Sequence, residues 1–200
     1  MSIIKLNNRS VKDITQFGSI SSLGSLTHIA TQTASSSASL SFTSGIDSTY
    51  KEYIFYFVNI HPSAQADFTF NLSTDGGSNY NVTKTTTDFR VFQTENGSST
   101  SLSYEGGLDL AQSTGEQIIA QSIDDANDAC SSGFVNLFNP SSTTFVKHFI
   151  GISSLIYADT YCMQERFAGY GNTTSAINAV RFKMSSGNID SGQILLFGLN

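Results

Sequence analysis

Three histidines, His28, His61 and His148, carry the only imidazole side chains of the chain. Imidazole ligates zinc where two such groups lie close together with a carboxylate or thiolate. These three are dispersed, and each falls in or at the end of a segment that we predict to be a strand. We therefore interpret them as exposed or hydrogen-bonded histidines and predict no metal site.

The densest acidic cluster is Asp124-Asp125-Ala126-Asn127-Asp128. Oxygen ligands that alternate along a loop hold Ca²⁺, and the residue types here are suitable. The regular D-x-D-x-D-G spacing and a following glutamate are missing, so a solvated acidic loop is favoured and a cation site is the alternative. Residues 75–80 are interpreted in the same way, first as a turn and second as a ligand loop.

Signatures of nucleophilic or cofactor chemistry are missing from the sequence. No G-x-S-x-G elbow stands between a strand and a helix, and neither a phosphate-binding loop nor a dinucleotide fingerprint occurs. Two carboxylates that face each other across a groove would hydrolyse glycosides, but such sites usually recruit aromatic platforms and the chain has no Trp. We expect no enzyme and no cofactor, and keep a glycan-cleaving enzyme as the third hypothesis.

The sequence has two cysteines, Cys130 and Cys162. Disulfide-stapled scaffolds carry more cysteines in a shorter secreted chain. We predict two reduced thiols; a bridge would need Cα atoms within about 7 Å of each other.

Composition indicates one soluble domain. The chain has 200 residues, of which 39% are hydrophobic, and its 15 Phe and 8 Tyr offer ample material for a core. Charged residues make up only 13%, and the net charge of −6 argues against binding to a phosphate backbone. No apolar run reaches the ~18 residues of a membrane span. The N-terminus lacks the features of a secretory signal, so we expect synthesis in a cytoplasm.

Apolar and polar residues alternate with period two from Leu26 onward, which predicts strands. The run Tyr53–Ile60 is apolar on both sides and predicts a central strand covered on both faces. After the alternating run 68–73, Asp75-Gly76-Gly77 is typical of a hairpin turn. One stretch, Gly115–Ser122, has the composition for a turn or two of helix. Further predicted strands are 38–43, 87–94, 101–104, 134–138, 145–152, 160–164, 179–184 and 193–197.

Many short strands separated by turn residues predict an all-β fold, an antiparallel β-sandwich that is jelly-roll-like, over residues 26–200. Residues 1–25 differ from the rest, because three of the ten basic residues precede a Gly/Ser stretch at 18–25. We interpret them as an extended N-terminal arm, with a first edge strand as the alternative. The side chains expected in the core are Phe55, Phe57, Phe68, Phe70, Phe149, Phe182 and Leu195.

The segments Phe42–Tyr53, Asn59–Pro62 and Arg181–Leu199 resemble virion proteins of tailed bacteriophages, particularly marine ones. In those proteins a closing strand of the type Ser-Gly-x-Ile-x-Leu-Tyr-Gly-Ile ends a jelly-roll-like domain. Here Phe197 stands where Tyr is usual, and Leu199 where Ile is usual. The resemblance implies a structural protein of the virion and brings no catalytic residues.

The resemblance implies first a capsid decoration (cement) protein, a homotrimer that binds the major capsid protein or other virion proteins and stabilises the shell. Its alternative is a tail-fibre tip, spike or adaptor that binds host glycan or another tail component. Neither reading involves nucleic acid or a membrane. The arm would anchor the body to the capsid, and its candidate anchoring residues are Ile3, Ile4, Lys5, Leu6, Arg9 and Lys12.

Overall fold

The computed structural model describes residues 26–157 and 160–199. The expected arm, with all six candidate anchoring residues, lies outside this range. Within it the chain forms twelve strands and no helix, and hence no helix long and apolar enough to cross a membrane. The strands are β1 (Thr27–Thr33), β2 (Leu40–Phe42), β3 (Glu52–Pro62), β4 (Ala66–Ser73), β5 (Lys84–Thr94), β6 (Thr100–Tyr104), β7 (Gln117–Ile123), β8 (Ser131–Phe138), β9 (Lys147–Tyr157), β10 (Tyr161–Gly171), β11 (Ala179–Met184) and β12 (Ile189–Leu199).

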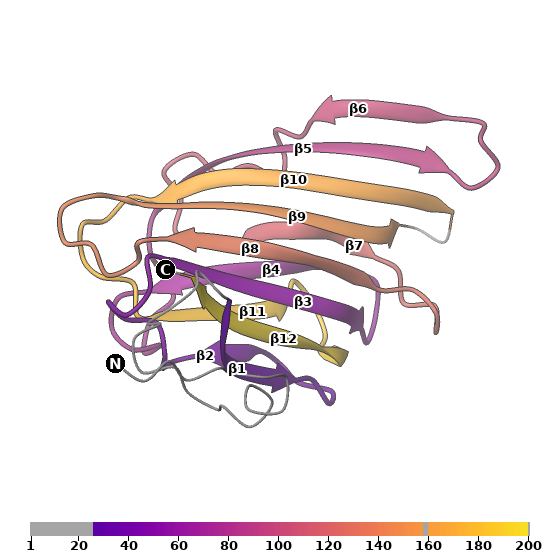
Figure 1. Ribbon diagram of the computed structural model, residues 1–200. Helices are drawn as coiled ribbons and strands as arrows, with labels where there is room; N and C mark the ends of the chain where they lie inside the picture. Colours follow the sequence, from indigo (N-terminus) through magenta and orange to yellow (C-terminus); the bar gives the residue numbers. More distant parts are fainter. Residues whose placement is uncertain (1–25, 158–159, 200) are drawn as a thin grey trace, which may run out of the picture.

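The strands form an antiparallel sandwich of two layers (Figure 1). The large sheet has the order β1-β12-β3-β8-β9-β10-β5-β6, and the small sheet has the order β7-β4-β11-β2. One residue pair, Ile123 of β7 with Tyr157 of β9, joins the two sheets along one side. The prediction of an all-β antiparallel sandwich is confirmed.

The core lies between the sheets and is built from phenylalanine rings that meet across the gap. Phe57 contacts Phe68 with ring centroids 5.4 Å apart, and Phe70 contacts Phe149 at 5.1 Å. Such edge-to-face pairs add to the stabilisation that burial of the rings provides. The side chains of the six predicted core phenylalanines are all buried.

The prediction that Leu195 lies in the core is wrong. Its neighbours Ile194 and Leu196 are fully buried, whereas Leu195 is half-buried on the opposite side of β12. Because successive side chains of a strand point to opposite faces, the four consecutive apolar residues 194–197 do not reveal which of them face the core.

The stretch 115–122, whose composition allowed a turn or two of helix, forms no helix, because β7 occupies most of it. Ile119 and Ala120 are fully buried, and β7 pairs with β4, for example Ala120 with Phe68. The β-branched residues Ile118 and Ile119 favour a strand. Pairing with β4 also supplies backbone hydrogen bonds, which a single isolated helical turn would largely lack.

The turn at Asp75-Gly76-Gly77 forms, but not as part of a hairpin. Both glycines have positive φ, 73° and 91°, and Asp75 accepts hydrogen bonds from the backbone N–H and the side-chain amide of Asn79. These bonds lower the pKa of Asp75 to about 2. The strands on either side belong to different sheets, since β4 lies in the small sheet and β5 in the large one.

Candidate interaction surface

The outer side of the large sheet faces away from the small sheet and carries a row of large side chains. The register places Tyr56, Phe134, Ile152, Arg166, Phe89 and Tyr104 opposite one another on β3, β8, β9, β10, β5 and β6. Val91 and Leu102 form the adjacent pair on β5 and β6, and Ile150 lies two residues before Ile152. We call the apolar members of this set the outer apolar face: Tyr56, Phe89, Val91, Leu102, Tyr104, Phe134, Ile150 and Ile152.

This face is unusually accessible. Five of the eight large hydrophobic side chains that are exposed in the described residues belong to it, and Leu102 is 72% and Tyr104 57% exposed. The expectation that β3 is covered on both faces holds for its inner side and for Ile54 on its outer side, but not for Val58, which is 44% exposed. Exposed apolar surface of this extent marks a contact surface for a protein, a membrane or a ligand.

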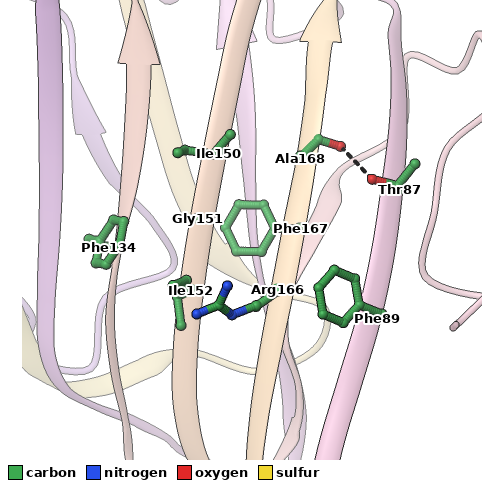
Figure 2. A pocket seen from close by; sticks show the side chains of 9 residues that line it. All are labelled: Thr87, Phe89, Phe134, Ile150, Gly151, Ile152, Arg166, Phe167 and Ala168. Atoms are coloured by element: carbon green, nitrogen blue, oxygen red, sulfur yellow. Dashed lines mark hydrogen bonds between the residues drawn. The ribbon is translucent and has the colours of Figure 1, made fainter. Parts of the chain in front are cut away.

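A shallow hollow of about 220 Å³ lies in the middle of this surface (Figure 2). Phe134, Ile150, Ile152 and Phe89 line it, and the guanidinium of Arg166 lies beside Ile152. Arg166 forms neither an ion pair nor a hydrogen bond within the described part of the chain. The hollow thus combines apolar walls with one unpaired positive charge.

Aromatic contacts continue the surface toward β1. The ring of Tyr56 contacts those of Phe134 and Phe197, at 6.1 and 5.8 Å between centroids, and Phe197 in turn contacts His28 at 5.4 Å. This series of ring contacts fixes the orientation of the aromatic side chains on β8, β3, β12 and β1. The surface is therefore a preformed platform.

The side of β5 opposite to this surface is largely buried and mostly polar, with Phe92 as its one apolar residue. Neither carboxylate oxygen of Asp88 has a hydrogen-bond partner among the described residues, and burial, assisted by the charge of Glu105, raises the pKa of Asp88 to about 7. The neighbouring Arg90 pairs with Glu105 at 2.9 Å and donates a hydrogen bond to Gln121. Asp88 is thus a carboxyl group that the fold keeps largely protonated below neutral pH.

A second carboxyl group, that of Glu165 on β10, is buried in the same region. Burial, and next the charge of Asp88, raises its pKa to about 8. The two carboxyl groups are enclosed and do not face a groove, in contrast to the open pair that a glycoside hydrolase needs.

The two buried lysines, Lys84 and Lys147, begin β5 and β9 and are held by oxygen atoms. Nζ of Lys84 donates to Asn71 Oδ1 at 2.6 Å and to the carbonyl of Val82 at 2.8 Å, and burial lowers its pKa to about 8. Nζ of Lys147 donates to the carbonyl of Phe145 at 2.6 Å. These contacts are typical of a structural role.

The acidic loop that the sequence singles out does not bring its carboxylates together. Asp124 is buried and its Oδ1 accepts the backbone N–H of Ala126 at 2.7 Å, whereas Asp125 and Asp128 are exposed. No group of three or more acidic, histidine or cysteine side chains within residues 26–157 and 160–199 is arranged to hold a metal ion.

His61 and Cys130 line one recess of the surface, and Cys130 and Cys162 line a second one. His61 shares a hydrogen bond with the carbonyl of Ala129 at 2.8 Å, and His28 shares one with the hydroxyl of Thr31 at 2.8 Å. Cys130 and Cys162 are free thiols, in agreement with the sequence-based prediction, and Cys162 is exposed.

Comparison with known proteins adds no relative, because no family model, no curated protein and no solved structure matches this chain. Its fold and surface define an all-β sandwich with an exposed apolar sheet face. Sequence reasoning missed that face, since its residues come from five strands in three separate parts of the chain, 52–62, 84–104 and 131–157.

Proposed function

We propose that this chain is a non-enzymatic structural protein of a tailed-phage virion, acting as a capsid decoration protein. The observation that carries the proposal is the outer apolar face, a preformed surface suited to contact with another protein. The resemblance of residues 181–199 to virion proteins is the reason for proposing that the protein is part of a phage particle. The proposed partners are the major capsid protein and further copies of the chain itself.

A decoration protein works by binding alone. A ligand that binds the assembled lattice and not its free subunits shifts the equilibrium toward the lattice. The composition of the chain suits this task, because Ser, Thr and Asn form hydrogen bonds across an interface without the desolvation that buried charges require. With only 13% charged residues, the chain has few charges to desolvate.

The direct test is to locate the protein on intact virions by electron microscopy and to count its copies by quantitative mass spectrometry. We expect density over the whole head lattice, and heads that lack the protein should disrupt at a lower temperature. A few copies confined to the tail would instead establish the tail-fibre or adaptor function, with host glycan or tail components as partners. Absence from purified virions would overturn the proposal.

A further inference from the structure

The hairpin of β5 and β6 carries most of its apolar side chains on the outer side of the large sheet. Phe89, Val91, Leu102 and Tyr104 lie there, whereas Phe92 lies on the inner side and packs against the core. The other residues on the inner side of β5 are polar, Asp88 among them, and β6 presents serines there. A strand normally turns its apolar side to the side that is dry. The pattern therefore indicates that the outer side of this hairpin is buried against another surface in the working state of the protein.

The inner side of the hairpin is already occupied by the chain itself. The segment 105–113 runs along β5, and its backbone N–H groups donate to the carbonyl of Asp88 from Glu105 at 2.9 Å and to Thr86 Oγ1 from Leu110 at 2.8 Å. These bonds and the pairing of β5 with β10 hold the hairpin in its orientation. The apolar side cannot turn inward, so only another molecule or a distant segment can cover it.

The area of the face matches one side of a protein interface. Its five most exposed side chains present roughly 450 Å² of mostly apolar surface, given the size of such residues. A standard interface buries about 800 Å² on each partner, and somewhat more than half of that is apolar. The polar residues around the face supply the remainder.

The face also carries both a projection and a recess. Leu102, at the centre of β6, is 72% exposed, and the hollow between β8, β9 and β5 measures about 220 Å³. A cavity of ~150 Å³ accommodates a benzene molecule, so the hollow has room for a leucine side chain. An interface between identical copies needs such complementarity: in a two-fold dimer residue i contacts residue j and j contacts i, and in a closed ring the projection of each copy enters the recess of the next.

We infer that the outer apolar face packs against a second copy of this chain, with Leu102 of each copy entering the hollow of its neighbour. Arg166 then lies at the rim of the filled hollow, within reach of aromatic rings of the partner. Arginine is enriched in protein interfaces. The inference rests on the proposed function only in treating this face as a contact surface.

The test is the oligomeric state of the full-length protein, measured by sedimentation velocity and light scattering over a range of concentrations. We expect the unmodified chain to be a dimer or trimer. Leu102→Glu should weaken association roughly 30-fold or more, as for a central hot-spot residue. The matched control is Phe145→Glu, because Phe145 is 69% exposed but lies in the loop between β8 and β9, outside the face. It should associate as the unmodified chain does.

The exposed thiol of Cys162 gives a second readout on the face itself. Cys162 lines a recess together with Val91 and Gln164, next to Leu102. In a Cys130→Ser background, a bulky maleimide should modify Cys162 slowly at high protein concentration and rapidly after dilution. In the Leu102→Glu variant, modification should be rapid at every concentration.

Two results would overturn the inference. One is a monomer at all concentrations with Cys162 always accessible. The other is an oligomer that Leu102→Glu leaves intact, which would place the self-contact elsewhere. Neither result bears on the presence of the protein in virions, so failure of this inference and failure of the proposed function remain distinguishable.

Discussion

The carboxylate of Glu165 accepts the backbone N–H of Gln121 with both of its oxygens, at 3.1 and 3.0 Å. This contact links β10 of the large sheet with β7 of the small sheet in a region where their strands are not paired. It also places a group with a raised pKa at the junction of the two layers. The stability of the sandwich should therefore depend on pH.

Stability should fall as pH rises from about 5 to 8. The ordinary pKa values of Asp88 and Glu165 are 3.8 and 4.5, and burial raises them in the fold to about 7 and about 8. At a pH between its unfolded and its folded pKa, each group is protonated in the folded chain and ionised in the unfolded chain. The free energy of unfolding is therefore highest below the unfolded pKa and decreases until the pH exceeds the folded pKa. At ~1.4 kcal/mol per pKa unit, this corresponds to a loss of order 2–4 kcal/mol from each of the two groups.

Urea unfolding at pH 5, 6, 7 and 8 measures this loss. Lys84 acts in the opposite direction at higher pH, because its pKa is lowered from 10.5 to about 8 and its contribution to stability rises above that value. The series should therefore stop at pH 8. Equal stability at pH 5 and pH 8 would contradict the assignment of raised pKa values.

Asp88→Asn should stabilise the protein at pH 8 and change little at pH 5. The amide is nearly isosteric with the carboxyl group and removes the cost of burying a charge whose two oxygens have no partner among the described residues. We expect a gain of about 1–3 kcal/mol at pH 8. Urea unfolding of both proteins at the two pH values checks this, and a loss of stability at pH 8 would show that the charge has an undetected partner.

Phe182→Ala should destabilise the fold by about 3–5 kcal/mol, the range for a large aromatic residue in a core. The ring is fully buried and stands against those of Phe55 and Phe68, at centroid distances of 5.4 and 5.8 Å. Phe145→Ala is the control, because Phe145 is exposed and its truncation should shift stability by less than ~0.5 kcal/mol. Thermal unfolding of the two variants distinguishes them.

Deletion of residues 1–18 should leave the sandwich folded and abolish capture by particles that lack the protein. The deleted segment contains Lys5, Arg9 and Lys12, whose charge would speed capture by an acidic lattice and fix its register. Circular dichroism measures the fold, and co-sedimentation measures binding. Normal binding of the truncated chain would exclude the arm as the anchor, and failure to fold would identify it as a strand of the body.

The alternation of residue types along the chain determined that these segments form strands and that their apolar sides make a sandwich. The predicted strand 179–184 matches β11 at both ends, and all six predicted phenylalanines lie in the core. These features depend on local patterns, since a strand with one apolar side must bury that side whatever its partners are.

Only the tertiary structure decided which side of a strand meets the second layer. For β5 the side that contains Asp88 turns inward together with Phe92, and the side that contains Phe89 and Val91 turns outward; the same uncertainty misplaced Leu195. The outer apolar face likewise exists only because β3, β8, β9, β10, β5 and β6 lie next to one another. The physical reason is that alternation divides a strand into two sides, whereas the environment of each side depends on partners far away in the sequence.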